Sequence, residues 1–116
     1  SFAETVAALR EDGTLVMADC GSFEDAQRAA RAGVDIVSTT LAGYTGDRVK
    51  TDGPDLELLR EVVAAFPDVP VICEGRVHTP EQAAAAIEAG AFAVIVGTAI
   101  THPTSITTWF KAAVEG

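Results

Sequence analysis

The chain has 116 residues, of which 48% are hydrophobic and 22% are charged, and its formal net charge at pH 7 is −9. This length supports one hydrophobic core but not two. The negative charge argues against nucleic acid or an anionic membrane as a partner, because both would repel the chain. No apolar run reaches the roughly 20 residues that a membrane-spanning helix needs, so we expect no membrane segment.

The two cysteines, Cys20 and Cys73, each lie at the end of a predicted buried strand. We expect both to be free thiols in the core, because free cysteine is commonly buried and disulfides are rare in reducing compartments. This expectation favours a cytoplasmic protein. Even with His78 and His102, the spacing does not resemble a zinc site, so we expect no metal.

Capping boxes at Ser1 with Glu4 and at Thr79 with Gln82, together with the spacing of apolar residues, predict five helices and four strands in the order α(βα)₄. Trp109 and Phe110 fit the apolar side of the last helix, and we expect both in the core. We expect helices over 1–12, 22–33, 55–66, 81–89 and from 103 onward, and strands over 14–19, 34–41, 71–73 and 92–96.

Two segments of the chain resemble each other. Residues 23–37 and 80–94 both give an alanine-rich helix, an Ala-Gly pair and an apolar strand. Such a repeat is typical of parallel α/β arrays, in which each strand is buried by its neighbours. The sequence therefore predicts an α/β fold of (β/α) units with parallel strands.

Four such units are half of an eight-stranded TIM barrel, which needs about 200 residues or more. Three arrangements fit 116 residues: the C-terminal half of a longer barrel, two copies that pair, or a small open sheet. We expect the first, a single partial domain over 1–116 that lacks the N-terminal half. The start on a helix without a methionine favours it.

Polar residues stand where the predicted strands end. In a barrel the strand ends meet at one mouth, where substrates bind. Ionisable side chains are costly at the ends of apolar strands unless they are used, so Asp19 and Glu74 are the candidate catalytic residues. The loop over 42–54 is long enough to be functional. The strand-end residues are Asp19, Thr39, Thr40, Glu74, Gly75, Arg76, Gly97 and Thr98.

The glycines of the last two strand ends favour a phosphate site. Many barrels hold a substrate phosphate there with backbone N–H groups. The candidate corners are Gly75-Arg76 and Gly97-Thr98. Three alternatives stay open: Gly97 serves close packing of helix and strand, Arg76 is a solvent-facing charge at the rim, and His102 only neighbours a helix N-cap.

Two motifs are more specific. Residues 39–45 read Thr-Thr-Leu-Ala-Gly-Tyr-Thr, and residues 74–83 read Glu-Gly-Arg-Val-His-Thr-Pro-Glu-Gln-Ala. With 17–20 and 96–103 they resemble the second half of the N-acetylmannosamine-6-phosphate 2-epimerases, in the same order and over nearly the whole chain. The resemblance implies a TIM barrel of sialic-acid and amino-sugar catabolism. Its members interconvert N-acetylmannosamine 6-phosphate and N-acetylglucosamine 6-phosphate at C2, without a metal or nicotinamide cofactor.

The resemblance also implies roles for residues. Glu74 matches the family's acid/base glutamate, and Asp19 matches an aspartate that positions sugar hydroxyls. The residues implied in substrate or phosphate binding are Thr40, Tyr44, Gly75, Arg76, Gly97, Thr98 and His102.

The chain departs from the family pattern at two points. The family's catalytic lysine comes from the N-terminal half, and neither Lys50 nor Lys111 stands in its place. His102 occupies a position where many members have arginine. We therefore expect a fragment that is inactive alone and has two partners: an amino-sugar phosphate, and either the missing half or a second copy in a homodimer. The alternatives are another phosphate-binding barrel enzyme, a synthase or isomerase, and a non-catalytic half-barrel that self-associates.

Overall fold

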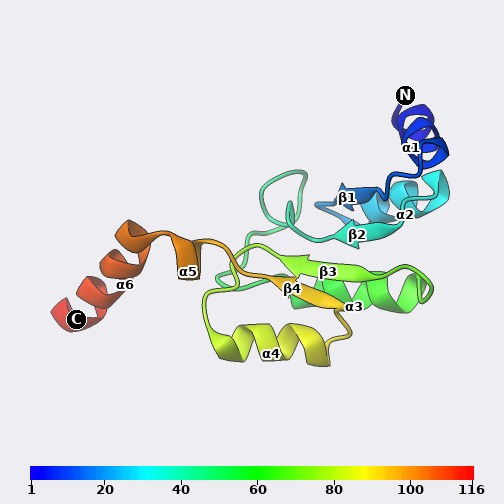
Figure 1. Cartoon of the computed structure of the whole chain (residues 1–116). Helices are drawn as coiled ribbons and strands as arrows, with labels where there is room; N and C mark the ends of the chain where they lie inside the picture. The colour runs from blue at the N-terminus through cyan, green and yellow to red at the C-terminus, as the bar shows by residue number, and fades with distance from the viewer.

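In the computed structural model, which describes residues 1–116, four strands form one parallel sheet in the order β1-β2-β3-β4 (Figure 1). This confirms the parallel α/β architecture that the repeat predicts. Three of the strands are shorter than predicted and β3 is one residue longer, because apolar runs also include residues beyond the ladder. Leu41, for example, lies in a turn and donates its N–H to the Cys20 carbonyl. The strands are β1 (Met17–Asp19), β2 (Ile36–Ser38), β3 (Val71–Glu74) and β4 (Ala93–Ile95).

Six helices accompany the sheet, one more than predicted. The extra helix is the single turn after β4, where the sequence indicated only a glycine corner. Two capping boxes form as predicted, Ser1 with Glu4 and Thr79 with Gln82. The helices are α1 (Phe2–Glu11), α2 (Phe23–Ala32), α3 (Leu56–Ala65), α4 (Pro80–Glu88), α5 (Thr98–Thr101) and α6 (Pro103–Glu115).

The two repeated segments fold as the α2–β2 and α4–β4 units. In each, a glycine with positive φ follows the helix, Gly33 at 84° and Gly90 at 106°. Gly90 has a second constraint, because a Cβ atom there would lie 2.8 Å from Val63 Cγ1. The shared Ala-Gly pair therefore marks a tight corner between helix and strand.

The sheet has one covered and one open face. Side chains alternate along a strand, and the residues that face the helices are almost fully buried, among them Val37 at 0% and Cys73 at 0% exposure. On the other face Met17 is 42% exposed and Ile95 is 38% exposed. In a closed barrel this open face would be the interior.

The cysteines behave as expected. Cys20 and Cys73 are both buried and free. Burial raises the pKa of the Cys20 thiol to about 11, with the neighbouring Asp25 and Asp19 carboxylates adding to the effect. Burial also raises the pKa of Cys73. No helix in the structure combines the length and the apolar character needed to cross a bilayer.

The molecule is elongated, 53 × 26 × 25 Å, with α1 at one end and α5 and α6 at the other (Figure 1). We call α5 and α6 the C-terminal arm. The prediction that Trp109 and Phe110 are core residues is wrong: they are 38% and 71% exposed. The apolar spacing identified one side of the helix, but no element of this chain covers that side.

Candidate active site

Glu74 ends β3 on the open face of the sheet, and a serine of the neighbouring strand holds its carboxylate. Ser38 Oγ donates to Glu74 Oε2 at 3.5 Å. Ser38 is fully buried, and its Oγ accepts the Thr40 N–H at 3.3 Å. The hydroxyl proton is thus free to point at the carboxylate. Ser38 therefore links the end of β2 to the candidate acid/base group.

A cavity of about 210 Å³ lies at the ends of β3 and β4, with Glu74 in its wall. It brings together seven of the nine candidate site residues, from three strand ends and the loop over 42–54. Polar groups and glycine backbone make up most of its surface. The lining residues are Thr40, Tyr44, Glu74, Gly75, Arg76, Val77, His78, Ile95, Gly97 and Thr98.

The two glycines have different structural requirements. Gly75 has a φ of 98°, and a Cβ atom there would lie 3.3 Å from the Thr40 carbonyl oxygen. Gly97 has a φ of −111°, which any residue adopts, and its Cβ position has no atom within 4 Å. Close packing therefore does not explain Gly97. Gly97 lines the cavity, and a side chain there would enter open space.

Arg76 lies against the loop over 42–54 and is not a solvent-facing rim charge. Its Nε donates to the Gly53 carbonyl at 3.1 Å, and its Nη2 donates to Thr51 Oγ1 at 3.4 Å. Its guanidinium stacks over the Tyr44 ring at 4.9 Å, beside Lys50 Nζ at 4.7 Å from the same ring. Arg76 Nη1 is buried without a hydrogen-bond partner. Arg76 thus ties this loop to the cavity wall through three contacts, and its Nη1 donor remains without an acceptor.

An ion pair between the partly buried Arg48 and the buried Asp55 ties the same loop to α3. Arg48 Nη2 donates to Asp55 Oδ1 at 2.9 Å, and Asp55 also caps α3 by accepting the Leu58 N–H at 3.0 Å. Burial opposes ionisation of Asp55, but the hydrogen bonds from Arg48 and Leu58 outweigh it and lower its pKa. The hydrogen bond to Asp55 raises the pKa of Arg48. The loop is therefore held by Arg76 on the cavity side and by Asp55 at the start of α3.

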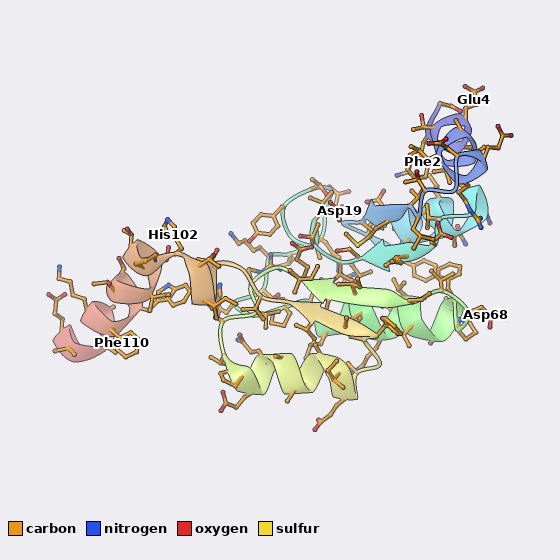
Figure 2. The ribbon with its side chains drawn as sticks, in the orientation of Figure 1. Phe2, Glu4, Asp19, Asp68, His102 and Phe110 are labelled. Atoms are coloured by element: carbon orange, nitrogen blue, oxygen red, sulfur yellow. The ribbon has the colours of Figure 1, made fainter.

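Two candidate residues, Asp19 and His102, do not line the cavity, and Figure 2 shows them on different parts of the molecule. Asp19 is exposed at the end of β1 and lines a separate hollow of about 520 Å³ along that free edge. Its pairing with Ser38 places it on the same open face as Glu74. His102 lies on the arm, where its Nδ1 accepts the Ser105 N–H at 3.3 Å and lies 2.6 Å from Ser105 Oγ. His102 therefore serves as the N-cap of α6.

Sequence reasoning missed four residues at this site. Ser38 supports Glu74 and pairs with Asp19 in the sheet, and its position at the end of an apolar strand was the available signal. Val77, His78 and Ile95 line the cavity. The His78 ring also lies 4.6 Å from the Trp109 ring, so α6 touches the cavity wall. No group of three His, Cys, Asp or Glu side chains gathers as a metal site.

Parallel (β/α) units with a carboxylate and two glycine corners at their strand ends define half of a (β/α)₈-barrel protein. A family model described as "Putative N-acetylmannosamine-6-phosphate epimerase" matches residues 1–116. The chain belongs to this epimerase family.

Relatives in two bacteria are both named "Putative N-acetylmannosamine-6-phosphate 2-epimerase". The one from Cutibacterium acnes is 59% identical over 99% of this chain and 51% of its own length. The one from Corynebacterium glutamicum strain R is 50% identical over 97% of this chain and 48% of its own length. The chain therefore spans about half the length of the curated relatives it matches.

The fold comparison agrees with the sequence comparison. The solved N-acetylmannosamine-6-phosphate 2-epimerase from Clostridium perfringens matches 97% of this chain with a TM-score of 0.92 and 42% identity. The match takes up 49% of that longer chain. The open sheet described above therefore has the arrangement of about half of a solved TIM-barrel epimerase.

Proposed function

We propose that residues 1–116 form a single partial domain, the C-terminal half-barrel of an N-acetylmannosamine-6-phosphate 2-epimerase. The observation that carries the proposal is the cavity in which Glu74 faces the same space as the Gly75-Arg76 and Gly97-Thr98 corners. Family membership supports it. The substrates would be N-acetylmannosamine 6-phosphate and N-acetylglucosamine 6-phosphate.

In this proposal Glu74 moves the proton at C2 of the open-chain sugar. The C2–H bond breaks, the proton passes to a base, and the electron pair forms a C1–C2 double bond as the C1 carbonyl becomes an oxyanion. Return of a proton to the opposite face of C2 gives the epimer. A carboxylate within reach of C2 can serve either step, and Ser38 holds this carboxylate from one side.

The phosphate would bind at the Gly75-Arg76 and Gly97-Thr98 corners of the same cavity. The first N–H groups of a helical turn lack backbone acceptors, and Gly97 leaves the space in front of them open. Arg76 Nη1 is buried without a partner, and such a donor gains about 1–3 kcal/mol when it finds an acceptor. Tyr44 and Thr40 complete this wall. Binding energy from the phosphate then positions C2.

Asp19 would contact the sugar from the neighbouring part of the open face. The β2 strand separates β1 from β3, and Glu74 lies two residues beyond Ile72, the β3 residue in register with Ser38 and Asp19, so the backbones at Asp19 and Glu74 are about 12 Å apart. A hexose phosphate spans such a distance. We therefore propose that Asp19 positions sugar hydroxyls and leaves proton transfer to Glu74.

The second proton-transfer group would come from outside this chain. Inversion at C2 needs a proton delivered to the face opposite the one it left. Neither lysine of the chain lines the cavity. Lys50 lies over Tyr44, and Lys111 pairs with Glu115 on α6 at 3.5 Å. The family resemblance assigns this role to a lysine of the other half-barrel.

The test is a Glu74→Gln variant in a reconstituted enzyme. The chain is co-expressed with the half of the Cutibacterium acnes relative that it does not match, and epimerisation and C2 deuterium exchange are followed by NMR. We expect Glu74→Gln to lose at least 100-fold in turnover while the Gly75, Gly97 and Thr98 amide signals still shift with N-acetylglucosamine 6-phosphate. Glu88→Gln, on the exposed side of α4, is the control. Unchanged turnover in Glu74→Gln would remove Glu74 from the mechanism.

The same complex tests substrate class. The epimerase proposal expects the two N-acetylhexosamine 6-phosphates to compete with each other, and glucose 6-phosphate to compete at least 10-fold more weakly. Equal competition by glucose 6-phosphate would favour another phosphate-binding barrel enzyme. Absence of any ligand response would favour a non-catalytic half-barrel.

A further inference from the structure

Two cations without carboxylate partners gather on one aromatic ring beside the cavity. Lys50 Nζ lies 4.7 Å and Arg76 Cζ lies 4.9 Å from the centre of the Tyr44 ring. None of the ion pairs in the structure includes Lys50 or Arg76. The chain has 17 Asp and Glu residues against 8 Lys and Arg residues, so carboxylates are not scarce. Because like charges repel, this arrangement is stabilised when an anion joins it.

A glycine in the loop over 42–54 allows the two cations to approach the same ring. The loop doubles back so that Gly43 lies against Lys50. A Cβ atom at Gly43 would lie 2.7 Å from Lys50 Cα and 3.2 Å from Arg76 Nη2. The first distance is well below the roughly 3.5–4.0 Å of an ordinary carbon contact. The path of the backbone, and not only a flexible side chain, therefore brings Lys50 beside Arg76.

The Tyr44 ring connects Lys50 to the cavity. Tyr44 and Arg76 line the cavity, whereas Lys50 does not. Arg76 is held in place by its hydrogen bonds to Gly53 and Thr51. Lys50 is exposed, and a cation–π contact at an exposed site is weak. Since lysine has a flexible four-carbon stem, the Lys50 ammonium group is free to swing from the ring to the cavity rim.

The charge of the ligand gives this freedom a use. A phosphate monoester carries a charge of about −1.5 to −2 at neutral pH, and the chain itself carries −9, so local cations must offset the repulsion. Arg76 is the one Lys or Arg side chain that lines the cavity. Arg48 is engaged by Asp55, and His102 caps α6 outside the cavity. Lys50 is thus the next positive charge available to a phosphate there.

We propose that Lys50 is a further phosphate-binding residue, whose ammonium group leaves the Tyr44 ring and pairs with a phosphate held at the Gly75-Arg76 corner. The identity of the sugar rests on the proposed function. The contact with phosphate does not, because inorganic phosphate has a similar charge and serves as a separate probe.

The first readout is the lysine side chain itself. The chain has two lysines, Lys50 and Lys111, and ¹³C-dimethylation gives each an NMR signal while keeping its charge. The labelled chain is titrated with N-acetylglucosamine 6-phosphate, with inorganic phosphate and with uncharged N-acetylglucosamine. We expect both phosphates to shift the Lys50 signal, which is assigned by its absence from Lys50→Gln. The uncharged sugar should leave it in place, and the Lys111 signal should stay constant throughout.

The second readout is affinity. Lys50→Gln should weaken binding of both phosphates about 10-fold, followed at the Gly75 and Gly97 amide signals of the chain. In the reconstituted enzyme it should raise KM by the same factor with little change in kcat, because the contact is equal in the ground state and the transition state. Lys50→Arg should stay within threefold of the unchanged chain. Arg60→Gln, at an exposed position of α3, removes the same charge and should stay within twofold.

The outcomes separate the contact from the proposed function. A Lys50 signal that neither phosphate moves, or an affinity that Lys50→Gln leaves unchanged, overturns the proposal even if the reconstituted enzyme is active. Equal weakening by Lys50→Gln and Arg60→Gln also overturns it, because only the overall charge of the chain would then matter. A Lys50 contact with both phosphates in a chain that never forms an active epimerase would keep the contact and reject the proposed function.

Discussion

At the scale of single residues, the contact between Ser38 and Glu74 decides how well the candidate acid/base group is held. Ser38 Oγ is the one side-chain hydroxyl that the structure places on the Glu74 carboxylate. We predict that Ser38→Ala lowers kcat of the reconstituted enzyme about 10-fold with little change in KM, because the substrate contacts remain.

The same variant leaves the Thr40 N–H without its acceptor. Its free energy of unfolding should therefore fall by about 1–2 kcal/mol, measured by urea titration of the chain. Ser22→Ala, which removes the N-cap of α2 far from the cavity, is the control for a purely structural loss. If Ser38→Ala and Ser22→Ala lower kcat equally, the positioning role of Ser38 is wrong.

The two glycine corners allow a matched comparison. Gly75 needs its φ of 98°, whereas Gly97 has neither a positive φ nor a neighbour at its Cβ position. We predict that Gly75→Ala lowers the free energy of unfolding by about 1–2 kcal/mol. Gly97→Ala should leave it within about 0.5 kcal/mol but weaken binding of N-acetylglucosamine 6-phosphate at least 10-fold, because the methyl group enters the cavity. Urea unfolding and NMR titration measure the two effects, and unweakened binding by Gly97→Ala would remove Gly97 from the phosphate site.

At the scale of elements, the loop over 42–54 and helix α3 share one anchor, the Arg48–Asp55 ion pair. The pKa of Asp55 is lower when folded than when unfolded. Below the ordinary aspartate value of about 3.9 the unfolded chain therefore takes up the proton first, and the stabilisation is lost as the pH falls. Above that value it is fully present.

We predict that Asp55→Asn costs about 1–3 kcal/mol of unfolding free energy at pH 7 and reduces the loss of stability between about pH 5 and pH 2. The asparagine keeps an oxygen for the Leu58 N–H but loses the charge. Urea unfolding across this pH range measures the effect. Asp68→Asn, at an exposed position before β3, controls for net charge. Parallel pH curves for Asp55→Asn and the unchanged chain would show that this pair does not contribute.

The elements also show what sequence patterns determine. The caps of α1 and α4 and the glycine after α2 depend on neighbouring residues, and they were predicted correctly. The lengths of β1, β2 and β4 were overestimated, because an apolar run records burial and not the extent of pairing. The contacts of Arg76 with Gly53 and Thr51 join residues more than 20 positions apart, and no local pattern indicates them.

At the scale of the whole molecule, periodicity predicts which side of an element is apolar but not what covers it. The repeat was sufficient to predict the parallel order of β1 to β4. The rule that polar residues at strand ends form the site likewise predicted most of the residues that line the cavity. The exposure of Phe110 could not follow from the sequence, because its spacing is the same whether the covering element belongs to this chain or to another.

Because the half-barrel is open, we also expect the chain by itself to lack epimerase activity. Its cavity lies at one end of the open face of the sheet, and it offers Glu74 but no lysine. We predict that the 116-residue chain binds N-acetylglucosamine 6-phosphate weakly and epimerises it at a rate indistinguishable from buffer. Epimerisation should appear when the unmatched half of the Cutibacterium acnes relative is added, with an activity that saturates at a one-to-one ratio. Turnover by the purified chain alone, abolished by Glu74→Gln, would contradict the need for a second proton-transfer group.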